Sequence, residues 1–405
     1  MSEAAEIPFA RPDIGNEEIE AVTRVLKSGW LTTGAEATAL EAEFSAFTGS
    51  RHAIAVSSAT AGLHLALEAF GIEAGDYVAL SPYTFASSAE VIRYLGAHPL
   101  FVDIEPEGYN ICPDALESVL TDTRKDGRRV RAIMPVHIAG HACAMGRIRD
   151  IARRFGLPVL EDAAHAIPTS DDTGARVGSQ GTAVFSFYAN KPVTSGEGGM
   201  VTTDDDEIAR RVRLMRLHGI DRTVWDRYRR PGAGWSYDVV EAGYKYNLPD
   251  ILASIGRVQL ARAGETHATR ARLAHRYSQH LSPVSGVTVR NNPDTDPTLL
   301  QTDAWHLYMI EVAQATRDRV IDYMAREGIN CSVHYRPLHM MSYYRSRYAL
   351  HDRDFPRAAA RFLGTVSLPL FPGLTEEEQN RVVTTLVRAL EVYSDEGEES
   401  RGTGS

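Results

Sequence analysis

The sequence predicts a three-layer α/β fold, in which a mostly parallel sheet lies between two layers of helices, followed by a smaller C-terminal α+β domain. Through the first half of the chain, short apolar segments alternate with helical patterns, which is typical of strands joined by helical connections. These segments are apolar on both faces, as expected of parallel strands covered by helices. The length of 405 residues, with 43% hydrophobic residues, is enough for two domains.

The expected elements of the first half begin with a strand at 52–58 and a helix at 61–71, and a second pair follows at 77–82 and 87–96. The strands expected after these pairs are 98–104, 131–138, 157–163, 182–189 and 198–203, and the helices are 145–156 and 205–219. No internal repeat interrupts this order.

Helical periodicity returns at 250–263 after a loop that contains aromatic residues and glycine, and we place the domain change there. The rest of the chain mixes a strand-like segment with helical patterns, at 305–312, 317–328 and 375–393. The final segment has no apolar face to bury, so we expect it to be disordered. We therefore predict a large domain, a small domain and a tail, with boundaries at 1–250, 251–393 and 394–405.

Composition and charge exclude several classes of protein. A formal net charge of -10 and a pI of about 5.8 disfavour partners such as nucleic acid or an anionic membrane. No apolar run is long enough to span a bilayer, and the N-terminus carries acids and a proline where a signal peptide needs basic and apolar residues. We therefore expect a cytoplasmic protein.

Neither the cysteines nor the histidines predict a metal site. Cys112, Cys143 and Cys331 are widely spaced and form no CxxC pair. His137 and His141 have the spacing of metal ligands on a helix, but they follow a strand, and no third ligand is evident. We therefore expect no metal.

Polar residues that follow the apolar segments are the first candidates for a ligand site, because ligands bind beyond the carboxyl ends of parallel strands. Glu161, Asp162 and His165 follow one such segment. A carboxylate there is suited to hold a protonated heterocyclic nitrogen, which keeps a pyridine ring electron-withdrawing. A helix cap or a satisfied polar strand end is the alternative.

Lys191 follows the next apolar segment and precedes a glycine-rich turn. A solvated lysine at a strand end is the more ordinary interpretation. The functional interpretation is a desolvated amine whose lowered pKa permits imine formation, with glycines that let the backbone approach a ligand.

Small and hydroxylated residues lie between the first strand and its helix, among them Ser57, Ser58 and Thr60. Free amides and the positive end of a helix dipole suit this position to a phosphate, although each hydroxyl is also suited to cap the helix. The P-loop lysine is missing, and no GxGxxG follows the first strand.

Together these segments resemble the DegT/DnrJ/EryC1/StrS sugar aminotransferases, which have the aspartate-aminotransferase fold (fold type I). The resemblance covers nearly the whole chain. The motifs that carry it are SGWLTTG at 28–34, SSATAGLHLAL at 57–67, EDAAHA at 161–166, SFYANKPVTSGEGGM at 186–200, GYKYNLPD at 243–250, VHYRPLH at 333–339 and LPLFPGLTEEE at 368–378.

The resemblance implies pyridoxal 5'-phosphate as cofactor, and the family's Schiff-base lysine falls on Lys191. The partner of the pyridinium nitrogen falls on Asp162, the neighbour of the ring hydroxyl on His165, and the aromatic residue that stacks on the ring on Phe85. The phosphate would be held by the backbone of Ala59 and Thr60, the hydroxyls of Thr60 and Ser186, and Asn247 from a second subunit. A homodimer with composite active sites follows from that last assignment.

Two positions depart from the family pattern, since Ala59 replaces a usual glycine and Asn190 a common threonine. Neither change removes a reacting group. The dehydratase relatives carry histidine in place of the lysine, so Lys191 favours transamination.

The segments VTSGEGGM and GYKYNL are most similar to those of enzymes that act on 4-keto sugars. The resemblance therefore implies transfer of an amino group from L-glutamate to a nucleotide-linked 4-keto-(6-deoxy)sugar, giving a 4-amino sugar for glycan or natural-product biosynthesis. Lys245, His334 and Tyr335 are candidates to contact this substrate. A cyclitol ketone or a 3-keto sugar is an alternative substrate, and a nucleotide-sugar oxidoreductase or binding protein is the competing class.

Overall fold

The computed structural model describes residues 5–221 and 237–402, and for residues 394–402 only the backbone. Part of the aromatic loop expected between the two halves of the chain lies outside the described residues. Within the described ranges, no helix combines the length and the apolar composition that crossing a membrane requires.

The sheet that positions the site has two hydrogen-bonded parts. Strands β1 (His52–Val56), β7 (Gly199–Thr203), β6 (Thr182–Ser186) and β5 (Leu160–Asp162) form one part in that order, and β3 (His98–Phe101), β2 (Tyr77–Leu80) and β4 (Val130–Ile133) form the other. Parallel bridges between Ile133 and Val159 and between Val136 and Asp162 connect β4 to β5. The two parts therefore make one continuous sheet.

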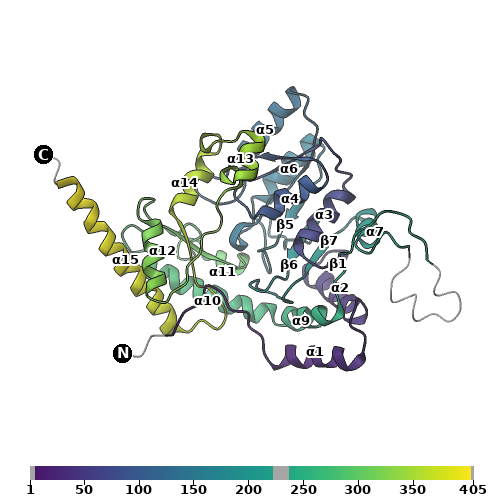
Figure 1. Ribbon diagram of the computed structural model, residues 1–405, viewed down its shortest axis with the longest axis horizontal. Helices are drawn as coiled ribbons and strands as arrows, with labels where there is room; N and C mark the ends of the chain where they lie inside the picture. The colour runs from purple at the N-terminus through teal and green to yellow at the C-terminus, as the bar shows by residue number, and fades with distance from the viewer. Residues whose placement is uncertain (1–4, 222–236, 403–405) are drawn as a thin grey trace.

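Helices cover both faces of this sheet, because successive side chains of a strand point to opposite faces. In β1, Ile54 and Val56 pack with α3 (Ala59–Ala69) and α7 (Asp206–Met215), while Ala53 and Ala55 pack with α2 (Ala35–Thr48) and α9 (Asp250–Ala261). The other covering helices are α4 (Ala86–Tyr94), α5 (Pro113–Lys125), α6 (Met145–Phe155) and α1 (Asn16–Ser28), which packs on α9. Figure 1 shows the resulting three layers.

A second apolar core lies in the C-terminal part of the chain, which Figure 1 draws in green to yellow. It contains the antiparallel strands β8 (Tyr308–Glu311) and β9 (Thr365–Leu368) and the helices α10 (Ala263–Leu281), α12 (Arg317–Arg326) and α15 (Glu376–Gly402). Of the short helices in this part of the chain, α11 (Leu299–Thr302) packs with this core. Tyr344 of α13 (Ser342–Tyr348) and Ala358 of α14 (Pro356–Gly364) instead belong to the core of the large sheet. Ile7 also belongs to this core, and its backbone pairs with Gly328 and Asn330.

The predicted fold class is confirmed, with one antiparallel strand inside the sheet. β7 runs antiparallel to both β1 and β6, while the other strand pairs of this sheet are parallel, so the sheet is mostly parallel as expected. The connection from β6 to β7 contains no helix, and parallel strands need a long crossover that is usually helical.

The predicted division into domains stays a prediction. Ile7 packs with the C-terminal core and not with the large sheet, although the predicted large domain includes it. α15 extends to Gly402, into the segment predicted to be a disordered tail.

Candidate active site

A cavity of about 440 Å³ opens beyond the carboxyl ends of β1, β5 and β6. Nine of the residues predicted for the site line it, namely Ala59, Thr60, Phe85, Asp162, His165, Ser186, Lys191, His334 and Tyr335. The other lining residues are Ser58, Thr84, Ser87, Val136, Ala164, Tyr188, Glu197 and Gly198. The strand ends therefore converge as the sequence predicted.

Lys191 reaches the cavity from the turn that follows β6, and its backbone amide donates to the Tyr188 carbonyl over 2.9 Å. Burial lowers the pKa of the Lys191 amine to about 7, and the Asp162 carboxyl opposes this shift. A substantial fraction of the amine is therefore neutral near pH 7. Lys191 is half-buried and lines the cavity, which fits the desolvated amine better than a solvated strand-end lysine.

Asp162 ends β5 and is 3% exposed. Its Oδ2 accepts a hydrogen bond from Ser88 Oγ over 2.7 Å, and its Oδ1 accepts one from the Ala164 amide over 3.2 Å. Burial raises the pKa of Asp162, while the Ser88 and Ala164 bonds and the nearby Lys191 lower it. These bonds favour the carboxylate, which is the form able to accept a proton-bearing ring nitrogen.

His165 lines the cavity as a neutral imidazole. Burial, followed by the charges of Lys191 and His334, lowers its pKa well below the ordinary value. Its Nδ1 accepts a hydrogen bond from the Ala139 amide over 3.2 Å, so Nε2 carries the proton and donates to the Tyr335 hydroxyl over 3.0 Å. The two bonds fix the ring's orientation.

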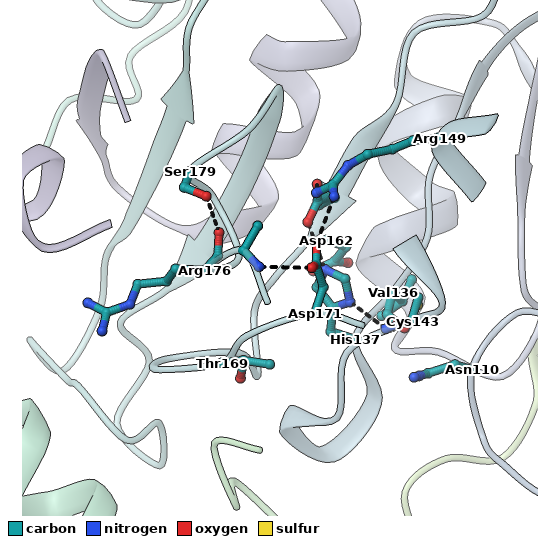
Figure 2. A network of polar contacts seen from close by, with 12 residues as sticks. Asn110, Val136, His137, Cys143, Arg149, Asp162, Thr169, Asp171, Arg176 and Ser179 are labelled. Carbon is teal, nitrogen blue, oxygen red and sulfur yellow. Dashed lines mark hydrogen bonds and ion pairs between the residues drawn. The ribbon is translucent and has the colours of Figure 1, made fainter. Parts of the chain in front are cut away.

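A buried ionic network supports the strand end beneath Asp162 (Figure 2). Glu161 lies 3.0 Å from Arg149 and 3.1 Å from His137, and Arg149 also pairs with Asp171 at 2.7 Å. The other ring nitrogen of His137 accepts from the Cys143 amide. Both ring nitrogens of His137 therefore have hydrogen-bond partners within the protein.

The described residues contain no group of three or more His, Cys, Asp or Glu side chains that could hold a metal ion.

The loop between β1 and α3 forms the end of the cavity suited to a phosphate. Ser58 caps α3 by accepting from the Ala61 amide over 3.1 Å, while Ala59 and Thr60 open the helix. A Cβ on Gly199 would lie 2.7 Å from the Ala59 amide nitrogen. Glycine at that position therefore lets β7 approach this loop, and the α3 N-terminus remains available to an anion.

Two predicted residues do not reach the wall of this cavity. The Asn247 amide donates to the Thr33 hydroxyl over 2.6 Å, and its oxygen accepts from Lys245. Asn247 also forms a backbone bridge with Val56 at the end of β1. Within one chain, Lys245 and Asn247 therefore lie beside the strand end and not among the cavity's lining residues.

Phe85 and His334 lie on the open side of the cavity. Phe85 is 60% exposed, and its ring centroid is 5.9 Å from that of Tyr335. Burial, followed by the charge of Lys191, lowers the pKa of His334 to about 4, and its Nδ1 lies 2.9 Å from Ser367 Oγ. An exposed aromatic ring at this place can cover a flat ligand.

Sequence reasoning missed Ser88 and His306. Ser88 bonds Asp162 from α4, and His306 Nε2 lies 3.3 Å from Lys191 Nζ. The only sequence signal for His306 is a histidine at the start of the expected strand at 305–312.

Together, the fold and the site define an enzyme that uses pyridoxal 5'-phosphate. The cavity fits that cofactor, because it combines a desolvated amine, a buried carboxylate and a helix N-terminus. A sequence model of the DegT/DnrJ/EryC1/StrS aminotransferase family matches residues 12–387. The chain belongs to this family of pyridoxal-phosphate-dependent sugar aminotransferases, which confirms the resemblance found in the sequence.

Relatives and solved structures agree with this assignment. The spore coat polysaccharide biosynthesis protein SpsC of Bacillus subtilis is 41% identical over 383 residues, which cover 93% of this chain and 95% of SpsC. Spr1654 of Streptococcus pneumoniae in its PLP form is 30% identical with a TM-score of 0.84, over 95% of this chain and 99% of the other. DesV of S. venezuelae, solved with a ketimine intermediate, is 30% identical with a TM-score of 0.83, over 95% and 98%.

Proposed function

We propose that the enzyme moves an amino group from L-glutamate to a nucleotide-linked 4-keto-(6-deoxy)sugar and releases the corresponding 4-amino sugar. The observation that carries this proposal is that the Lys191 amine and the Asp162 carboxylate lie in one cavity. The amine has a pKa of about 7. An amine of this pKa can attack a carbonyl and can also accept and return a proton near neutral pH.

When bound, pyridoxal 5'-phosphate supplies a ring that withdraws the electrons left behind as the proton leaves the carbon that bears nitrogen. Asp162 would hold the ring nitrogen in its protonated form, since Ser88 and the Ala164 amide keep the carboxylate oriented. His165 would lie beside the ring oxygen, and Phe85 would cover the ring.

The phosphate would lie at the N-terminus of α3. Ala59, Thr60 and Ser186 line the cavity, and we propose that the amides of Ala59 and Thr60 and the hydroxyls of Thr60 and Ser186 hold the phosphate. The helix dipole favours an anion there. These residues would fix the ring so that the Lys191 amine moves its proton between two defined positions.

We further propose a homodimer in which Asn247 and Lys245 of each chain complete the site of the other. Their position beside β1, away from the cavity wall of their own chain, supports this assignment. The expected cytoplasmic location stays a prediction.

The sugar specificity is supported by the residues at the open side of the cavity and by the relatives. SpsC carries polysaccharide biosynthesis in its name, and DesV was solved with a ketimine intermediate. We propose that His334 and Tyr335 contact the sugar nucleotide, since they line the cavity beside Phe85. A cyclitol ketone and a 3-keto sugar remain the alternative substrates.

The test is a panel of ketones with glutamate or glutamine as donor. Nucleotide-linked 4-keto and 3-keto sugars and cyclitol ketones are each incubated with the holoenzyme, and the products are identified by mass spectrometry. We expect glutamate-dependent amination of a 4-keto sugar, which Lys191→Ala abolishes and the control Lys125→Ala, at an exposed position on α5, retains. Amination of a cyclitol or a 3-keto sugar alone would contradict the proposed substrate, and turnover by Lys191→Ala would contradict the role of the lysine.

A further inference from the structure

His306 is a buried polar side chain that the proposed function does not use. It is 4% exposed, and its Nε2 lies 3.3 Å from Lys191 Nζ. Its Nδ1 has no hydrogen-bond partner within the part of the chain that the structure describes. A buried ring nitrogen without a partner is destabilising. An apolar residue would therefore fill this space at lower cost if packing alone were required.

The backbone around His306 is held from two sides. Its amide donates to the Ala139 carbonyl over 2.9 Å, and the buried Arg270 guanidinium donates to the carbonyls of Trp305 and His306. Trp305 has a φ of 49°, which is unfavourable for a residue with a side chain. The surrounding contacts therefore impose a strained turn that points the next side chain, His306, at the lysine.

The neighbours of His306 keep its imidazole uncharged. The ring lies against His165, with ring centroids 4.4 Å apart. Burial lowers the pKa of His306 well below its ordinary value, and the charges of Lys191 and Arg270 lower it further. A neutral imidazole has one nitrogen that accepts and one that donates. An ammonium group has only donors, so Nε2 is the acceptor whenever Lys191 is protonated.

We propose that His306 is a positioning residue for Lys191, whose Nε2 accepts a hydrogen bond from the free amine and fixes where that nitrogen stands during proton transfer. This inference rests on the proposed function only in taking Lys191 as the reacting amine. A lysine side chain has four rotatable bonds, and a single fixed acceptor reduces the positions that its amine occupies. The same bond favours the protonated amine over the neutral one.

The test separates the two ring nitrogens. In His306→Gln the amide reaches the position of Nε2, whereas in His306→Asn it reaches only that of Nδ1. His306→Phe keeps the ring and removes both nitrogens. The matched control is His339→Phe, because His339 is fully buried and neither of its ring nitrogens has a hydrogen-bond partner among the described residues.

The first measurement needs no turnover. The cofactor-free full-length chain is labelled with a pulse of acetic anhydride at a series of pH values, and labelling of the Lys191 peptide is quantified by mass spectrometry. We expect the labelling midpoint to fall by about one pH unit in His306→Phe and His306→Asn. His306→Gln and His339→Phe should keep the midpoint of the unaltered chain.

The second measurement follows the holoenzyme. We expect kcat to fall about tenfold in His306→Phe and His306→Asn with little change in KM, because only proton transfer is affected, and to recover in His306→Gln. An unchanged labelling midpoint in both His306→Phe and His306→Asn would overturn the proposal, as would equal behaviour of the Asn and Gln variants. If His306→Phe does not fold, the comparison of Asn with Gln decides alone. Failure of the proposed function would appear separately, as sugar amination by Lys191→Ala.

Discussion

Replacing Ser88 with alanine should shift the acid limb of the pH–activity profile to higher pH. Ser88 donates to Asp162 Oδ2 over 2.7 Å, and the carboxylate is 3% exposed. A hydrogen bond to a buried charged group contributes about 1.5–3 kcal/mol. This free energy corresponds to roughly one to two pKa units. The carboxyl pKa is already raised by burial, so loss of the bond should raise it further.

The sign follows from the form of Asp162 that the reaction needs. If the carboxylate is required, activity disappears as the pH falls through the Asp162 pKa, and a higher pKa moves that loss to higher pH. The assay is kcat for sugar amination from pH 4 to 9. The matched control is Ser254→Ala on α9, because Ser254 is 1% exposed and donates only to a carbonyl of its own helix. An acid limb that moves by less than about 0.3 units in Ser88→Ala, or equally in both variants, would refute the reasoning.

Three further predictions concern the loop, the ionic network and pH. Gly199→Ala should weaken binding of pyridoxal 5'-phosphate at least tenfold, as measured by equilibrium dialysis, because the new Cβ would lie 2.7 Å from the Ala59 amide nitrogen. Gly264→Ala is the control, since a Cβ there meets open space, and it should bind the cofactor normally. Arg149→Met should lower the free energy of unfolding by about 3 kcal/mol in urea titrations, because it leaves the buried Glu161 carboxylate, 2% exposed, without the Arg149 guanidinium. A loss below about 1 kcal/mol would contradict a stabilising role for this buried ionic network. In the folded chain His334 has a pKa lowered to about 4. Between pH 6.5 and 4 the unfolded chain therefore binds more protons at this residue than the folded chain does, so the free energy of unfolding falls as the pH drops. His334→Gln should reduce this slope by about 1 kcal/mol per pH unit in urea titrations at successive pH values, and an unchanged slope would contradict the shift.

The central strands and their polar ends could be predicted from the sequence. β5 and β6 are buried along their whole length, so their apolar runs carry a clear signal, and parallel strand ends meet at one edge of a sheet. This is why Asp162 and Lys191 were expected together. Asp162 and Lys191 lie in one cavity because each follows an apolar strand, and the fold places the two strands next to each other.

Other features depend on contacts that local patterns do not carry. His306 meets Lys191 across 115 residues of sequence, and Ser88 meets Asp162 across 74. The direction of β7 depends on the connection before it, and β9 is only four residues long. α10 went unpredicted although it spans Ala263–Leu281, because its buried side includes the charged Arg270. Such a helix shows a weak apolar period.

The most direct test of the account is where the cofactor attaches. The holoenzyme is reduced with borohydride, digested and analysed by mass spectrometry to find the residue that carries the phosphopyridoxyl group. We expect that Lys191 alone is modified, and that Lys191→Ala takes up no reducible cofactor. A modification on another lysine, or full retention of reducible cofactor by Lys191→Ala, would contradict this expectation.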